Sequence, residues 1–148
     1  MDFQLTEEQR LIRDTVRDFA RTEIAPRAAE IDRTREFPMD NYRKCAELNL
    51  TGMMVPEEWG GAALDSVSYA IAVEELSRAC ASTGVIISVN NSLYCDPLQR
   101  YGTDEQKARW LKPFAAGEKL GCYCLTEAHS GSDASALRTT AVREGEGW

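Results

Sequence analysis

The sequence predicts a mainly α-helical fold over residues 1–117, followed by the first strands of a β-rich part over residues 118–148. Two capping boxes, in which a threonine is followed three residues later by a glutamine, begin at Thr6 and Thr103. Apolar residues recur at spacings of three and four through most of the first part. Beyond Gly117 the helical spacing is replaced by short runs that are typical of strands.

The first capping box starts a helix along which apolar residues lie on one face. Pro26 either interrupts this helix or opens a further turn through Ile31. Phe37-Pro38 marks a boundary, and residues 41–48 predict a second, short helix that Gly52 ends. These elements form the start of the helical part.

The centre of the helical part is a loop followed by further helices. Residues 53–64 contain proline and glycine and predict a loop in which Trp59 is a packing anchor. Asp65 is placed to cap the next helix. The apolar positions of that helix are Tyr69, Val73, Leu76 and Cys80. Residues 85–94 predict a core helix, and Gly117 is placed to stop the last one.

Two strands are predicted after the helices, at residues 120–126 and 138–143. Residues 144–147 predict a hairpin turn, and the chain stops at Trp148 before a returning strand. Because natural domains rarely end on an unpaired strand edge, we expect a truncated chain. The transition near residue 117 is the only domain boundary that the sequence predicts.

The bulk composition excludes several function classes. The 17 basic and 24 acidic residues give a net charge of −7, which repels nucleic-acid phosphates and anionic membranes. No signal peptide and no membrane span are expected. The five cysteines are odd in number and predict reduced, buried structural thiols in a cytoplasm-like compartment. Cys122, Cys124 and His129 are too few ligands for a metal site, so none is predicted.

The segment LGCYCLTEAHSGSDA, residues 120–134, is the most informative stretch for function. A short apolar run turns abruptly into a small, polar loop that contains glycine. The loop offers hydroxyls and a carboxylate, but the segment has no paired nucleophile and base. The pattern therefore predicts a strand that delivers a ligand-binding loop.

Three motifs in order resemble the acyl-CoA dehydrogenase family along the whole chain. They are FQLTEEQRLIRDTVRDFARTEIAPRAAEIDR, VPEEWGGAALD and YGTDEQKARWLKPFAAGEKLGCYCLTEAHSGSDA. The run ASTGVIISVNNSLYCDPLQRYG is closest to the short-chain, butyryl-CoA branch. The resemblance implies an N-terminal helical domain and the start of a middle β-domain. In the family a C-terminal helical bundle follows, and FAD lies between the last two domains.

The resemblance also implies site residues. The first flavin-binding segment would comprise Tyr123, Cys124, Leu125, Thr126, Glu127, Ala128, His129, Ser130, Gly131 and Ser132. The Thr126 hydroxyl would hydrogen-bond the isoalloxazine ring, and Gly131 and Ser132 would lie near the pyrophosphate and the acyl thioester. Substrate-binding residues would be Ser132 together with Val89, Asn90 and Leu93 in the floor of the acyl cavity. The alternative for Asn90 and Asn91 is that they pack within the helices, with their side-chain amides bonded to protein groups.

One departure from the family pattern follows the Thr-Glu pair. The family usually has proline and then small residues there, whereas this chain has Ala128, His129 and Ser130. The loss of proline removes a backbone restriction, and the histidine adds a bulky, titratable group. A solvent-facing histidine is favoured over a functional one.

The implied reaction is α,β-dehydrogenation of a fatty acyl-CoA. A glutamate removes the α-proton, and the β-hydrogen leaves as hydride to flavin. That glutamate lies in the C-terminal domain, beyond residue 148, so no catalytic residue is assigned within this chain. Glu74 and Glu75 are expected on a helix surface, and Glu127 in loop structure.

The implied partners are acyl-CoA, an electron-transferring flavoprotein and three further copies in a homotetramer. The expected location is the cytoplasm of a bacterium, or the mitochondrial matrix if a transit peptide has been removed. Two alternatives remain open. One is a different flavoenzyme on the same scaffold. The other is a non-catalytic helical interaction module.

Overall fold

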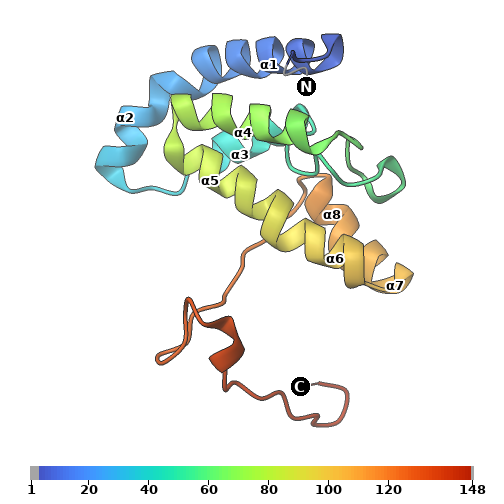
Figure 1. Ribbon diagram of the computed structural model, residues 1–148. Helices are drawn as coiled ribbons and strands as arrows, with labels where there is room; N and C mark the ends of the chain where they lie inside the picture. Colours follow the sequence, from blue (N-terminus) through green and yellow to red (C-terminus); the bar gives the residue numbers. More distant parts are fainter. Residues whose placement is uncertain (1–3, 148) are drawn as a thin grey trace.

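Helix α1 (Glu7–Phe19) packs on α4 (Ser66–Ala79), and α4 packs on α5 (Ala81–Val89), as Figure 1 shows. The computed structural model describes residues 4–147. The other helices are α2 (Ala25–Thr34), α3 (Met39–Glu47), α6 (Asp96–Tyr101), α7 (Asp104–Gln106) and α8 (Lys112–Ala115). Short 3-10 turns occupy Glu57–Trp59 and Ala134–Ala136. The mainly helical prediction is confirmed.

The predicted helix starts are present with their capping bonds. The Thr6 hydroxyl accepts from the amide of Gln9 at 3.1 Å, and the Gln9 side chain accepts from the Thr6 amide at 3.1 Å. The capping box at Thr103 is formed in the same way. Asp65 caps α4, and the Gln9 side chain donates to it at 3.2 Å. This contact joins the beginnings of α1 and α4.

Prolines inside the helices widen the backbone rather than break it. Three π-helical segments, Ala20–Ile24, Asn90–Cys95 and Lys107–Leu111, end two residues before Pro26, Pro97 and Pro113. The residue before each proline donates its amide to the carbonyl five residues back. Because proline has no N–H and crowds the carbonyl four residues back, the π turn relieves the conflict. The helix therefore continues past residue 26 instead of being interrupted.

Two clusters of apolar side chains hold the helices together. Ile24, Met53, Leu76 and Ile87 in the larger cluster have no exposed surface. Each such burial contributes about 1.5–3 kcal/mol. The smaller cluster contains Phe114 and Ala115 of α8 and Leu111 just before it, and the partly buried Trp59 packs against it as expected. Residues 85–94 do not form a wholly buried helix, because Val85 is 60% exposed.

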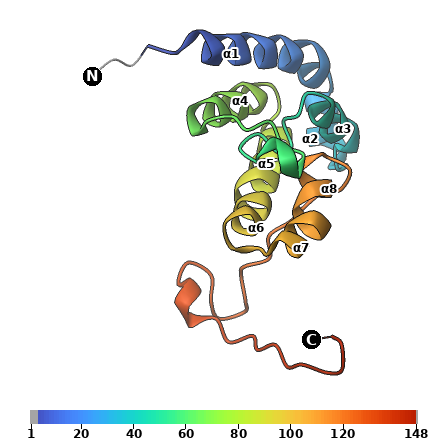
Figure 2. The same cartoon turned by 90° about the vertical axis from the view of Figure 1, so that its right-hand side faces the viewer.

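The predicted strands do not form within the described residues. In residues 120–147 only two isolated bridges occur, Glu127 with Ser130 and Glu144 with Gly147. A strand needs a neighbouring backbone to accept and donate its hydrogen bonds, and among the described residues none lies beside 120–126 or 138–143. Figures 1 and 2 both show this segment extending away from the helices. The hairpin turn at 144–147 is confirmed.

The cysteines divide between the two parts of the chain. Cys45, Cys80 and Cys95 are buried, as predicted, but Cys122 and Cys124 are exposed. The prediction of burial is wrong for this second pair because they lie on the extended segment, where no neighbouring element covers them. All five are free thiols.

Within residues 4–147, no helix is both long and apolar enough to cross a lipid bilayer. Likewise, this described part brings together no set of three or more histidine, cysteine, aspartate or glutamate residues that could hold a metal ion.

Candidate functional site

The chain leaves the helical body at residues 119–121. The Tyr42 hydroxyl donates to the Lys119 carbonyl at 2.7 Å, and the Gly121 amide donates to Asn90 Oδ1 at 2.9 Å. A Cβ atom at Gly121 would overlap the ring of Tyr94. Glycine is therefore required where the chain passes this ring. Burial raises the pKa of Tyr42, so its hydroxyl stays protonated and can donate.

Asn90 and Asn91 stand side by side on the second π turn and are both buried. Asn90 Nδ2 donates to the carbonyls of Thr51 at 2.7 Å and Phe114 at 3.2 Å. Asn91 Nδ2 donates to the carbonyls of Leu50 and Ile87, and its Oδ1 accepts from the Met53 amide. The adjacent amides are satisfied by protein groups, which was one of the two alternatives for these residues.

Residues 122–126 form an extended stretch whose polar groups are free. Among the described residues, no hydrogen bond involves the amides of 122–126 or the Thr126 hydroxyl. Tyr123 is half exposed, and Thr126 is exposed. This stretch can therefore bond to any ligand or strand that lies beside it.

A tight turn follows at residues 127–130. The Glu127 amide donates to the Ser130 carbonyl at 2.8 Å, and Ala128 and His129 lie exposed at the tip. Ser130 is buried, and its hydroxyl donates to the Asp133 carbonyl at 2.6 Å. The turn forms without proline at residue 128.

The Glu127 carboxylate closes a loop that runs from residue 127 to residue 139. Its two oxygens accept from the backbone amides of Arg138 at 2.8 Å and Thr139 at 2.9 Å. Hydrogen bonds from Thr139 and from the Arg138 amide lower the pKa of Glu127. The exposed His129 lies 3.4 Å from this carboxylate, so it has a partner that the sequence did not indicate. This carboxylate serves loop structure, as predicted.

Gly131 has room for a side chain. A Cβ atom there would meet only the Thr126 side chain, at an ordinary contact distance of 3.6 Å. Its backbone is not in the left-handed region. Nothing in the described fold therefore requires glycine at this position.

The other two glutamates considered at the sequence level lie on α4. Glu74 is exposed and pairs with Arg78, as expected for a helix surface. The expectation of an exposed position is wrong for Glu75. Glu75 is buried, and it accepts hydrogen bonds from Arg17 Nε at 3.1 Å and Nη2 at 2.6 Å. The hydrogen bonds from Arg17 lower the pKa of Glu75. This pair fastens α1 to α4 and leaves no free base.

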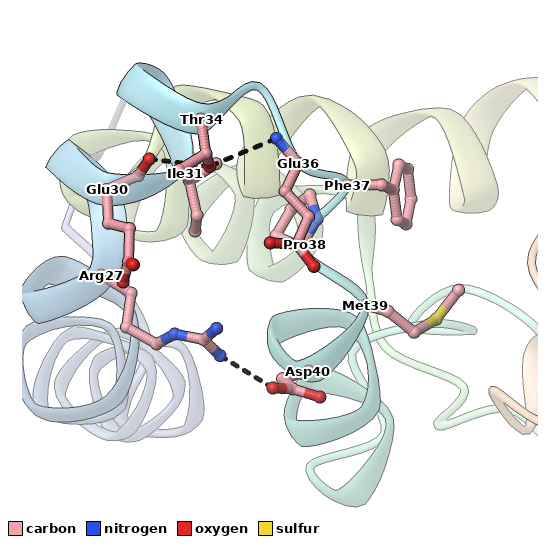
Figure 3. A pocket seen from close by; sticks show the side chains of 9 residues that line it. All are labelled: Arg27, Glu30, Ile31, Thr34, Glu36, Phe37, Pro38, Met39 and Asp40. Carbon is pink, nitrogen blue, oxygen red and sulfur yellow. Dashed lines mark hydrogen bonds and ion pairs between the residues drawn. The ribbon is translucent and has the colours of Figure 1, made fainter.

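A small pocket lies elsewhere, between the end of α2 and the start of α3 (Figure 3). Within its lining, Arg27 Nη1 donates to the Asp40 carboxylate at 3.0 Å. The Thr34 hydroxyl donates to the Glu30 carbonyl at 2.9 Å. No residue of 120–134 lines this pocket, so it is separate from the candidate segment.

The residues predicted to bind substrate lie in different environments. Val89 is half-buried, Leu93 is 41% exposed, and Asn90 is fully buried. Ser132 is exposed on the loop, and within the described residues no hydrogen bond joins it to the α5 region. Their contact with substrate stays a prediction. The structure connects Asn90 to the candidate segment through Gly121, a link for which the sequence held no local signal.

Comparison with known proteins places the helical part in a family. The model for "Acyl-CoA dehydrogenase, N-terminal domain" matches residues 6–118. The mitochondrial short-chain specific acyl-CoA dehydrogenase of Bos taurus is 51% identical over 145 residues, which are 98% of this chain and 35% of that protein. The short-chain specific acyl-CoA dehydrogenase of Clostridium acetobutylicum is 50% identical and covers 99% of this chain and 38% of that protein.

Two solved structures share the fold. Butyryl-CoA dehydrogenase from Megasphaera elsdenii superposes with a TM-score of 0.86 at 34% identity, covering 94% of this chain and 37% of that one. A chain in a structure described as the electron transferring flavoprotein of Acidaminococcus fermentans gives 0.93 at 43% identity, covering 98% of this chain and 38% of that one. The chain thus spans about a third of the length of the relatives it matches. By the extent of the family model and these identities, the chain belongs to the acyl-CoA dehydrogenase family.

Proposed function

We propose that this chain is the N-terminal part of a flavin-dependent acyl-CoA dehydrogenase that acts on short acyl-CoA thioesters. Residues 123–132 form its first flavin-binding segment in this proposal. The relatives named short-chain specific, at 50% and 51% identity over nearly the whole chain, support the substrate class. The butyryl-CoA dehydrogenase of similar fold supports it as well.

The observation that carries the cofactor proposal is the set of free polar groups on the extended segment. The edge of an isoalloxazine ring carries donors and acceptors that need backbone partners at close range. Within the described residues, 122–126 have unpaired amides and Thr126 has a free hydroxyl, and a Cβ atom at Gly131 would meet only the Thr126 side chain. These residues fit FAD, which would supply a hydride acceptor when bound.

Neither Glu75 nor Glu127 can act as the general base of the proposed reaction. Glu75 is paired with Arg17, and Glu127 holds two backbone amides, so neither is free to remove an α-proton. We therefore place the general base outside these residues, in the C-terminal domain that the family carries. In this proposal, the residues of this chain bind and orient the flavin and the substrate, and the C-terminal domain of the family supplies the base.

The proposed partners follow from the same family. They are an acyl-CoA substrate, an electron-transferring flavoprotein that receives the electrons, and further copies in a homotetramer. Both a mitochondrial and a bacterial relative occur among the similar proteins. We propose the bacterial cytoplasm, or the mitochondrial matrix, as the compartment.

Thr126→Val in the complete flavoenzyme tests the cofactor contact. The substitution keeps the branched shape and removes the hydroxyl. Losing one hydrogen bond of about 0.5–1.5 kcal/mol should raise the dissociation constant of FAD about 2- to 13-fold. Flavin fluorescence quenching and the visible spectrum measure this change.

Thr140→Val is the matched control, because Thr140 is also an exposed threonine beyond the helical body and lies outside residues 123–132. It should leave flavin affinity unchanged. Equal affinity and spectrum in the Thr126 variant and the unsubstituted enzyme would contradict the contact. Absence of FAD from the unsubstituted enzyme would contradict the proposed function itself.

A further inference from the structure

The flavin-binding segment of the proposed function is attached to the helical body at one place. Tyr42 holds the Lys119 carbonyl, Asn90 holds the Gly121 amide, and the ring of Tyr94 lies against Gly121. We call Tyr42, Asn90 and Tyr94 the exit clamp. Every hydrogen bond made by the described residues 122–147 stays within that range and reaches no residue of the helical body.

Building on the proposed function, we propose that Asn90 is a positioning residue that sets where and in which direction the flavin-binding segment leaves the helical body. Its side chain has no exposed surface. Both amide hydrogens are used by the carbonyls of Thr51 and Phe114, and the oxygen accepts from Gly121. One side chain therefore joins Thr51, between α3 and α4, to α8 and to Gly121.

The π turn explains how this side chain reaches three separate elements. The wider turn at Asn90–Cys95 carries two adjacent asparagines that are both buried. Pro97 provides the reason for the widening, since the amide of Asp96 bonds five residues back to Asn91. The position of the proline thus contributes to the orientation of the clamp.

The length of the segment makes the clamp important. Thr126 lies five residues beyond Gly121, which is about 16 Å along an extended backbone at about 3.3 Å per residue. A rotation of about 10° at Gly121 would move Thr126 by about 3 Å, enough to break a hydrogen bond to a fixed ring. Removing the Asn90 contact should therefore affect flavin binding without any direct contact to the cofactor.

Asn91 provides a matched control on the same turn. Asn90→Leu removes hydrogen bonds to one amide and two carbonyls, and Asn91→Leu also removes bonds to one amide and two carbonyls. Leucine has a similar branched shape in both cases. Only the Asn90 set includes an atom of the chain that leads into the flavin-binding segment, the amide of Gly121.

The experiment compares both variants in the complete holoenzyme, at a temperature where circular dichroism shows each to be folded. Asn90→Leu should weaken FAD binding about tenfold and shift the flavin visible spectrum, whereas Asn91→Leu should stay within about twofold of the unsubstituted enzyme. Hydrogen exchange of the Gly121 amide is the readout independent of flavin. It should accelerate about tenfold or more in the Asn90 variant alone.

Equal losses of flavin affinity in the two variants would overturn the inference, because they would reflect general destabilisation. Unchanged exchange of the Gly121 amide in Asn90→Leu would overturn it as well. If Asn90→Leu does not fold, Tyr42→Phe replaces it, since it removes only the hydroxyl that holds Lys119. That variant should weaken FAD binding about 2- to 5-fold, and an unchanged affinity would refute the clamp. No FAD in the unsubstituted protein would instead identify the proposed function as the failure.

Discussion

Replacing Gly117 by alanine should destabilise the helical body through two separable effects. Gly117 has φ +76°, in the left-handed region, where a Cβ atom costs about 1–2 kcal/mol. That Cβ atom would also overlap the Cβ atom of Ala46 on α3 and lie 3.0 Å from the Thr51 hydroxyl. Forcing an extra carbon into such a packed site costs about 1–3 kcal/mol more. The expected loss in free energy of unfolding is about 2–5 kcal/mol.

Gly60→Ala is the control for backbone strain. Gly60 has φ +83°, but the nearest atom to its Cβ would be the Lys112 carbonyl oxygen at 3.3 Å. This variant should therefore cost about 1–2 kcal/mol, mainly from the left-handed backbone. Urea unfolding followed by circular dichroism measures both variants.

Ala46→Gly in the Gly117→Ala background isolates the clash. Removing the Ala46 side chain costs about 1 kcal/mol in α3 by itself, but it should relieve the overlap in the double variant. The coupling between the two substitutions should be about 1–3 kcal/mol in the stabilising direction. Additive effects, or a Gly117→Ala loss no larger than that of Gly60→Ala, would refute the packing argument.

Three further predictions concern the 148-residue chain. With a thiol reagent at neutral pH, Cys122 and Cys124 should react fast, and the buried cysteines should react only on unfolding. Burial raises the pKa of Cys45 and Cys95 to about 12. Three or more fast-reacting thiols would contradict this prediction. Asp65→Ala should cost about 1 kcal/mol through loss of the α4 cap. Hydrogen bonds lower the pKa of Asp65 below 3.8, and the largest contribution comes from the Ser68 amide. The ionised carboxylate therefore stabilises the fold above that pH. This contribution disappears as the pH falls through the lowered pKa. Unfolding midpoints of wild type and Asp65→Asn from about pH 6 to about pH 2.5 check the sign, because the asparagine variant should lose less stability in acid. The chain alone should not oxidise butyryl-CoA with FAD and an artificial acceptor, because the proposed base lies outside it; turnover above a no-protein control would show that the base has been misplaced.

The sequence by itself determined the features that depend on neighbours along the chain. Thr6 and Thr103 with their glutamines, and Asp65 with the following amides, form caps whose partners lie within three residues. The left-handed Gly117 at the end of the helical part follows from equally local chemistry. The segment 120–134 was also recognisable, because its change from apolar to small polar residues is written in consecutive positions.

Only the tertiary structure decided the features that join distant positions. Glu75 was expected at the surface, but Arg17 lies 58 residues earlier in the chain and pairs with it in the packed helices. Residues 120–126 have the composition of a strand but find no partner backbone in the described chain, because strand pairing is not a property of one segment. Asn90 bonds Thr51, Phe114 and Gly121, which lie 39, 24 and 31 positions away along the chain. Such bonds depend on how elements pack, and a local pattern of residues does not encode which partners packing will bring together.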